Sequence, residues 1–126
     1  MIGQTLYFST PSCRVIAIDA VNGVEKWIFN PGVNLKKDYS EITSRGVSAW
    51  TDGNSNTRIF IATIDGRLIA LDAKTGQPIS SFGKDGTIDL KAGIGNDLSV
   101  TSPPAVIGNT LYWDLLLAII SGMIIQ

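Results

Sequence analysis

The sequence predicts an all-β protein of short antiparallel strands, and an internal repeat is the main reason. Residues 6–29 and 59–82 align without a gap at an offset of 53 residues, and eight of their positions are identical. Residues 107–112, IGNTLY, then match IGQTLY at 2–7 in five of six places. Such repeats of several β-rich runs are typical of architectures that pack small sheets side by side. We therefore expect antiparallel four-stranded meanders that form about two blades of a β-propeller.

Both copies of the repeat show the same order of elements. A β-rich run is followed by a polar turn, a second β-rich run, a second turn and a third run that ends in an aromatic residue. The first copy has these runs at residues 6–8, at 14–18 and before Phe29, and the second has them at 59–61, at 67–71 and before Phe82. Each copy should therefore supply three or four strands.

The turn before the third run has the same chemistry in both copies. It reads Asp19-Ala-Val-Asn-Gly23 in the first and Asp72-Ala-Lys-Thr-Gly76 in the second. An Asp carboxylate can cap backbone amides at the start of such a turn, and Gly accepts a positive φ at its end. The pattern predicts two tight hairpins.

Two blades and part of a third cannot close a ring. A single meander leaves one face and its edges uncovered, and such surfaces pair with other chains, so we expect the chain to fold poorly alone and to aggregate. Residues 30–58 and 83–104 are polar and rich in Gly and Pro, and they are longer than hairpins require. Long loops at one rim of a scaffold commonly carry a binding site.

The composition of the chain excludes some classes of function. The 126 residues suit one domain, and a net charge of −1 with a pI of about 5.2 offers no basic face for nucleic acid. There is no histidine, and Cys13 is the one cysteine. The start MIGQTLYF lacks the features of a signal peptide, and the apolar residues 115–125 would span about half of a bilayer core, so we expect no membrane span.

Candidate metal and catalytic groups are weak. Asp52, Asn54 and Asn56 stand where a calcium loop has ligands, but Thr57 and Thr63 occupy the positions that need Gly and a bidentate carboxylate, so a structural turn is favoured. The remaining candidates are carboxylates for which no spacing fixes a shared face, namely Asp85, Asp89 and Asp97. We assign no catalytic residue and no metal ligand.

Two tryptophans and one arginine carry more information. A propeller tryptophan commonly docks one blade on the next or lines the central channel, and we expect Trp27 to dock, while both roles stay open for Trp50. Arg45, in SRGVSAW, lies in the loop that enters a blade. A guanidinium there can give two parallel N–H groups to a carboxylate, although a surface salt bridge is the simpler role.

Three segments read together resemble one family. They are SRGVSAW, RIFIATIDGRLIALDAKTGQPISSFGKDGTIDL and VTSPPAVIG. Over residues 1–112 the chain resembles the quinoprotein dehydrogenases that use pyrroloquinoline quinone (PQQ), most closely the membrane-bound glucose dehydrogenase branch. The resemblance implies an eight-bladed propeller in the periplasm, or on a membrane facing it, that holds PQQ and Ca²⁺ and oxidises an aldose sugar or an alcohol by hydride transfer to the quinone.

The resemblance also assigns site residues. It implies that Arg45 pairs with a PQQ carboxylate and that Thr101 contacts PQQ, with Ser102 as the alternative neighbour. The family's catalytic Asp and metal ligands lie in blades beyond this sequence. The chain should then supply one wall of a cofactor site and be inactive alone.

Residues 113–126 depart from the family, and we expect them to be the product of a frameshift near Trp113. Two other interpretations stay open. One is a non-catalytic PQQ-like propeller that serves as a scaffold for protein binding, which would need neither Arg45 nor the TSPP turn. The other is a small stand-alone β-protein, which would melt cooperatively as a monomer.

Overall fold

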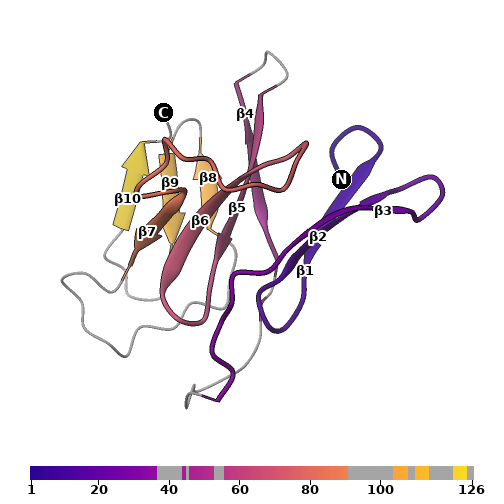
Figure 1. The fold of residues 1–126 in the computed structure, drawn as a ribbon. Helices are drawn as coiled ribbons and strands as arrows, with labels where there is room; N and C mark the ends of the chain where they lie inside the picture. Colours follow the sequence, from indigo (N-terminus) through magenta and orange to yellow (C-terminus); the bar gives the residue numbers. More distant parts are fainter. Residues whose placement is uncertain are drawn as a thin grey trace.

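The structure is a computed structural model that describes residues 1–36, 44, 46–52, 56–90, 104–107, 110–113 and 121–124 (Figure 1). These residues form antiparallel sheets joined by turns. Within the described ranges, no helix is long and apolar enough to cross a membrane.

Three sheets, which we call blades 1, 2 and 3, follow one another along the chain (Figure 1). Blade 1 contains β1 (Thr5–Ser9), β2 (Val15–Asp19) and β3 (Glu25–Phe29), blade 2 contains β4 (Ser48–Thr51), β5 (Thr57–Ala62), β6 (Arg67–Asp72) and β7 (Thr87–Asp89), and blade 3 contains β8 (Ala105–Ile107), β9 (Thr110–Trp113) and β10 (Ser121–Ile124). The prediction of antiparallel meanders is confirmed, with four strands in blade 2 and three in the described parts of blades 1 and 3.

The Asp-to-Gly turns form as predicted in both copies. The Asp19 carboxylate accepts the Val21 amide at 2.8 Å, and Asp72 accepts the Lys74 amide at the same distance. Gly23 and Gly76 end these turns with φ of 75° and 74°. The backbone therefore repeats at the sequence offset of the two copies.

Trp27 joins blade 1 to blade 2. Its indole Nε1 donates to the Ala73 carbonyl at 3.0 Å, and the Tyr7 hydroxyl donates to the same carbonyl at 3.0 Å. A Cβ placed on Gly76 would lie 2.5 Å from the Trp27 ring. The ring thus rests directly on the Gly76 backbone, and the predicted docking role of Trp27 is confirmed.

An apolar core lies between blades 1 and 2 around this contact. Blade 1 presents one set of alternate side chains and blade 2 presents the facing set, and both are at most 9% exposed. They are Val15, Ala17 and Trp27 from blade 1, and Ile59, Ile61, Ile69 and Leu71 from blade 2. Alternate strand positions therefore point into one shared core.

The opposite face of blade 2 has its own core. It contains Phe60, Ala62, Leu68, Ala70, Phe82 and Leu90, with Val106 of β8 packed against it. Both faces of blade 2 are covered, which explains why β5 and β6 each carry a run of four buried residues. In blade 1, by contrast, burial alternates along the strands.

The predicted third run of the second copy, ending at Phe82, is wrong as a strand. Within residues 77–82 a single residue, Pro78, forms an isolated bridge, to Leu71. The outer strand of this blade is instead β7. Proline has no N–H with which to continue a ladder, and Gly83 and Gly86 turn the chain with φ of 57° and 87°. Phe82 instead fills the core, with its ring centroid 5.5 Å from that of Phe60.

The two turn glycines give a matched test of the docking contact. Gly23→Ala places an alanine at positive φ where nothing lies within 4 Å, so it should cost only backbone strain, about 1 kcal/mol. Gly76→Ala has nearly the same φ but meets the Trp27 ring, so it should cost about 1–3 kcal/mol more. Urea unfolding of both variants measures the difference, and equal losses of stability would contradict the docking contact.

Candidate functional site

The candidate site lies along one edge of the blades, which we call the loop edge. It contains the β1–β2 turn (residues 10–14), the β5–β6 turn (residues 63–66) and the segment after β3, at the lower edge in Figure 1. The strands β4 and β8 also begin at this edge, because Ser48 pairs with Phe60 near the end of β5 and contacts Pro104, just before β8.

The two hairpin turns at the loop edge have the same construction. In blade 1 the Thr10 hydroxyl accepts the Arg14 amide at 3.2 Å, and in blade 2 Thr63 accepts the Arg67 amide at 3.0 Å. Cys13 and Gly66 occupy the same position with φ of 66° and 83°. Cys13 is therefore a non-glycine residue in a conformation that favours glycine.

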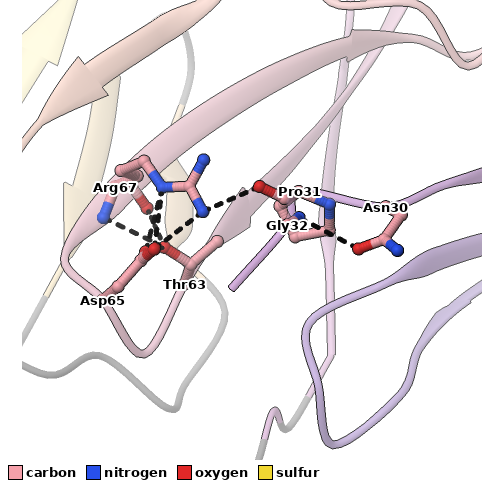
Figure 2. A network of polar contacts seen from close by, with 6 residues as sticks. All are labelled: Asn30, Pro31, Gly32, Thr63, Asp65 and Arg67. Atoms are coloured by element: carbon pink, nitrogen blue, oxygen red, sulfur yellow. Dashed lines mark hydrogen bonds and ion pairs between the residues drawn. The ribbon is translucent and has the colours of Figure 1, made fainter. Parts of the chain in front are cut away.

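Arg67 fastens the segment after β3 to blade 2 (Figure 2). Its Nη2 donates to an Asp65 carboxylate oxygen at 2.7 Å and to the Pro31 carbonyl at 2.9 Å, and its Nε reaches both Asp65 oxygens at 3.0 and 3.1 Å. The Thr63 hydroxyl donates to Asp65 as well. The Asn30 side chain in turn accepts the Gly32 amide at 2.9 Å. This fork geometry orients a planar guanidinium toward the Pro31 carbonyl, in the segment that follows blade 1.

The contacts of Arg67 with Asp65 and Pro31, which we call the Asp65–Arg67 anchor, are absent from the first copy. Ser12 stands where the second copy has Asp65, and its hydroxyl lies 3.2 Å from that of Thr10. Arg14, the counterpart of Arg67, is exposed. Of these two copies, only the second has a carboxylate that orients the arginine.

Cys13 is completely buried beside this network. Burial raises the pKa of the Cys13 thiol above its ordinary value, and the Ile64 backbone opposes this shift. The Asp65 carboxylate also raises that pKa, whereas Arg67 lowers it. The thiol is therefore kept protonated and acts as a small apolar group that closes the core below the loop edge.

The three predicted PQQ contacts, Arg45, Thr101 and Ser102, lie outside the described residues. Their neighbours along the chain can be described. Ser44 donates its hydroxyl to the Ser9 hydroxyl at 2.9 Å, and the Ser48 hydroxyl donates to the Pro104 carbonyl. The start of β4 is thus joined to the start of β8.

The opposite edge of blade 2 holds a cavity of about 350 Å³. Trp50 lines it, and the Arg58 guanidinium lies 5.4 Å from the centroid of the Trp50 ring, which is a cation–π contact. Trp50 also packs against the second core. Trp50 therefore packs within blade 2 and beside this cavity.

Asp52 and Asn56, two of the three candidate ligands in the calcium-loop pattern, are hydrogen-bonded to each other. Asn56 Nδ2 donates to one Asp52 oxygen at 2.7 Å, and the Asn56 amide donates to the other at 3.3 Å. Both residues line the same cavity beside Trp50. In the part of the chain that the structure describes, no group of three or more His, Cys, Asp or Glu residues is arranged to hold a metal ion.

The anchor of Asp65, Arg67 and Pro31 was not predicted from the sequence. The signal available was the identity of Arg14 and Arg67, combined with the change from Ser12 to Asp65. That difference marks the copy in which the arginine has a carboxylate beside it. The contact with Pro31, 36 residues away, leaves no local pattern.

Replacement of Arg67 tests the anchor against its counterpart in the first copy. Arg67→Gln removes the contacts with Asp65 and the Pro31 carbonyl, and should lower the free energy of unfolding by about 1–2 kcal/mol and speed tryptic cleavage after Lys36. Arg14→Gln should change stability by less than about 0.5 kcal/mol. Equal effects of the two variants on both measurements would show that Arg67 fastens nothing.

Comparison with known proteins gives the family. Residues 1–115 match the family model of the PQQ glucose/ethanol/alcohol dehydrogenase β-propeller domain. Quinoprotein glucose dehydrogenase of Escherichia coli is 30% identical over 125 residues, which cover 87% of this chain and 16% of that protein. Quinohemoprotein alcohol dehydrogenase ADH IIB of Pseudomonas putida is 42% identical over 79 residues, which cover 60% of this chain and 11% of that protein.

Solved structures agree. Quinohemoprotein alcohol dehydrogenase from Comamonas testosteroni superposes with a TM-score of 0.73 at 26% identity, covering 87% of this chain and 15% of that one. BamB from Moraxella catarrhalis superposes with a TM-score of 0.51 at 20% identity, covering 90% of this chain and 27% of that one, a likeness of fold alone. The chain spans about a sixth of the length of the curated relatives. On the family match over residues 1–115, the chain belongs to the PQQ glucose/ethanol/alcohol dehydrogenase β-propeller family.

Proposed function

We propose that the chain forms one wall of the PQQ site of a dehydrogenase that oxidises an aldose sugar or an alcohol. When bound there, PQQ would supply the acceptor for a hydride from the substrate carbon. In this proposal Arg45 pairs with a PQQ carboxylate and Thr101, or its neighbour Ser102, gives a second contact. The chain alone does not catalyse this reaction, because its sequence matches neither the family's catalytic Asp nor its Ca²⁺ ligands.

The observation that supports the proposal most is the junction between the starts of β4 and β8, the strands that follow these residues along the chain. Ser48, three residues after Arg45, donates to the carbonyl of Pro104, two residues after Ser102. The starts of β4 and β8 are therefore held together, so a ligand placed before one strand start lies before the other as well.

The described residues around the junction are small and polar, which suits a polar ligand. The Ser44 hydroxyl donates to the Ser9 hydroxyl and the Ser48 hydroxyl to the Pro104 carbonyl, so the Ser9 hydroxyl proton is the one that can be given to a ligand, and Gly46, next to Arg45, has a φ of 137° that residues with a side chain rarely adopt. Guanidinium and hydroxyl donors are suited to carboxylates and quinone oxygens.

The Asp65–Arg67 anchor also supports the proposed site. Pro31, which Arg67 holds, begins the segment that leads to Arg45. Fixing that segment at its start reduces the conformational freedom lost when a ligand binds. We also propose, from the family resemblance, that the whole protein faces the periplasm.

Binding of PQQ itself tests the site. The full chain, titrated with PQQ and followed by quenching of tryptophan fluorescence, should bind about tenfold or more weakly after Arg45→Ala, because a charge-assisted pair is lost. The matched control is Arg14→Ala, an exposed arginine at the same loop edge, which should leave the affinity unchanged.

Two results would contradict the proposal. Tight PQQ binding that Arg45→Ala does not change would place the cofactor elsewhere. Equal weakening by Arg14→Ala and Arg45→Ala would reduce the interaction to general attraction between positive and negative charges.

A further inference from the structure

The cavity of blade 2 lies at the edge opposite the loop edge, where β4 and β6 end and β5 begins (Figure 1). Its volume is about 350 Å³, which is within the range of sites for small molecules. Among the described residues that line it, Asp52 and Asp72 supply two carboxylates, and Arg58 and Lys74 supply two cations. The cavity is therefore polar and balanced in charge.

Arg58 stands at the centre of this lining. In the strand register it pairs with Trp50 on one side and with Asp72 on the other, so the three side chains share one side of the sheet. Its Nη1 is buried from solvent and has no hydrogen-bond partner among the residues that the structure describes. A buried donor without an acceptor is unfavourable, and folded proteins commonly satisfy such a group with water or a bound molecule.

The first copy of the repeat satisfies the same position internally. Thr5 corresponds to Arg58 and Lys26 corresponds to Ile79 at the repeat offset. The Lys26 ammonium donates to the Thr5 hydroxyl at 2.7 Å, so that pair is complete without a ligand. In the second copy an isoleucine has replaced the partner, and the larger polar side chain lines a cavity instead.

The charges of the lining do not favour a simple ion. Lys74, which stands where the first copy has Val21, is exposed at the rim, and so is Asp52. An anion attracted by the two cations would also lie near the two carboxylates, and a cation would meet the reverse arrangement. Attraction and repulsion therefore largely cancel for either sign.

A hydroxyl group suits this lining better, because it donates and accepts at the same atom. It can accept from the two cations and donate to the two carboxylates. Trp50 and Ile79 add apolar surface to the cavity, against which C–H groups can pack. A carbon frame that carries several hydroxyl groups combines both kinds of contact.

We propose that this cavity binds a neutral polyhydroxy compound the size of a monosaccharide, one of whose hydroxyl oxygens accepts from the Arg58 guanidinium. Because Nη1 is buried in the empty cavity, the end of the arginine side chain turns toward this oxygen when the compound binds. Arg45, Thr101 and Ser102 take no part in the site, so the proposal does not depend on the proposed PQQ contacts.

Titration of the full chain with methyl α-D-glucopyranoside, in the absence of PQQ, tests the site. This glycoside has the hydroxyl groups of a sugar but no free anomeric carbon to be oxidised or to react with a lysine. Saturation-transfer NMR should detect binding, and the indole resonance of Trp50 should shift saturably with the same affinity. Sodium acetate and ethylammonium chloride should cause no saturable shift of that resonance.

The variants replace residues of the cavity by those of the first copy. Arg58→Thr combined with Ile79→Lys gives blade 2 the polar pair that blade 1 already has, and should weaken binding about tenfold or more while the chain stays folded. Lys74→Val, at the exposed rim, should weaken it only about threefold. Arg14→Met, at the loop edge, is the matched control and should leave the affinity unchanged.

Three outcomes would overturn the proposal. Absence of a saturable response to the glycoside would show that the cavity holds water only. A saturable response to acetate or ethylammonium without one to the glycoside would make the cavity an ion site. Binding of the glycoside that the Arg58→Thr and Ile79→Lys pair does not change would place the compound elsewhere on the chain.

Discussion

The contact of the Trp27 indole with the backbone of Ala73 and Gly76 is the constraint on which the rest of the structure depends. The indole N–H donates to the Ala73 carbonyl at 3.0 Å, and the ring lies so close to Gly76 that a Cβ at that position would not fit. A small sheet has two faces and cannot bury both by itself. The indole sets how closely blade 1 approaches blade 2, and the apolar core forms at that spacing.

The relative positions of the segments at the loop edge depend on this docking. Because blade 1 is held against blade 2, the chain leaving β3 passes close enough to blade 2 for Arg67 to bind the Pro31 carbonyl. The starts of β4 and β8 are held together by Ser48 and Pro104 in the same way. Loops that leave a rigid scaffold at fixed points can present side chains to a ligand without large losses of entropy.

Much of the fold could be predicted because the same residue types occur at the same spacing in both copies of the repeat. The Asp19 and Asp72 turns, the paired strands and the docking of Trp27 all follow from residue types at fixed spacing. The outer strand of blade 2 could not be predicted. Pro78 has no N–H with which to continue the strand pairing, Gly83 and Gly86 turn the chain, and the Phe82 side chain packs in the core.

The candidate site was less predictable from the chain itself. Arg45, Thr101 and Ser102 come from a family resemblance and lie outside the described residues, so their contacts with PQQ stay predictions. The Asp65–Arg67 anchor is visible in the structure, yet its target is distant in sequence. Local patterns identify turns and strand faces, whereas a contact between blades depends on how the sheets pack.

A double-mutant cycle between Trp27→Phe and Gly76→Ala measures the docking contact most directly. If the alanine is costly because it meets the indole, its penalty should shrink to that of backbone strain once the smaller ring is present, with a coupling free energy of about 1 kcal/mol or more. Strictly additive effects of the two substitutions on urea unfolding would contradict the account, because the glycine would then be required for its backbone conformation alone.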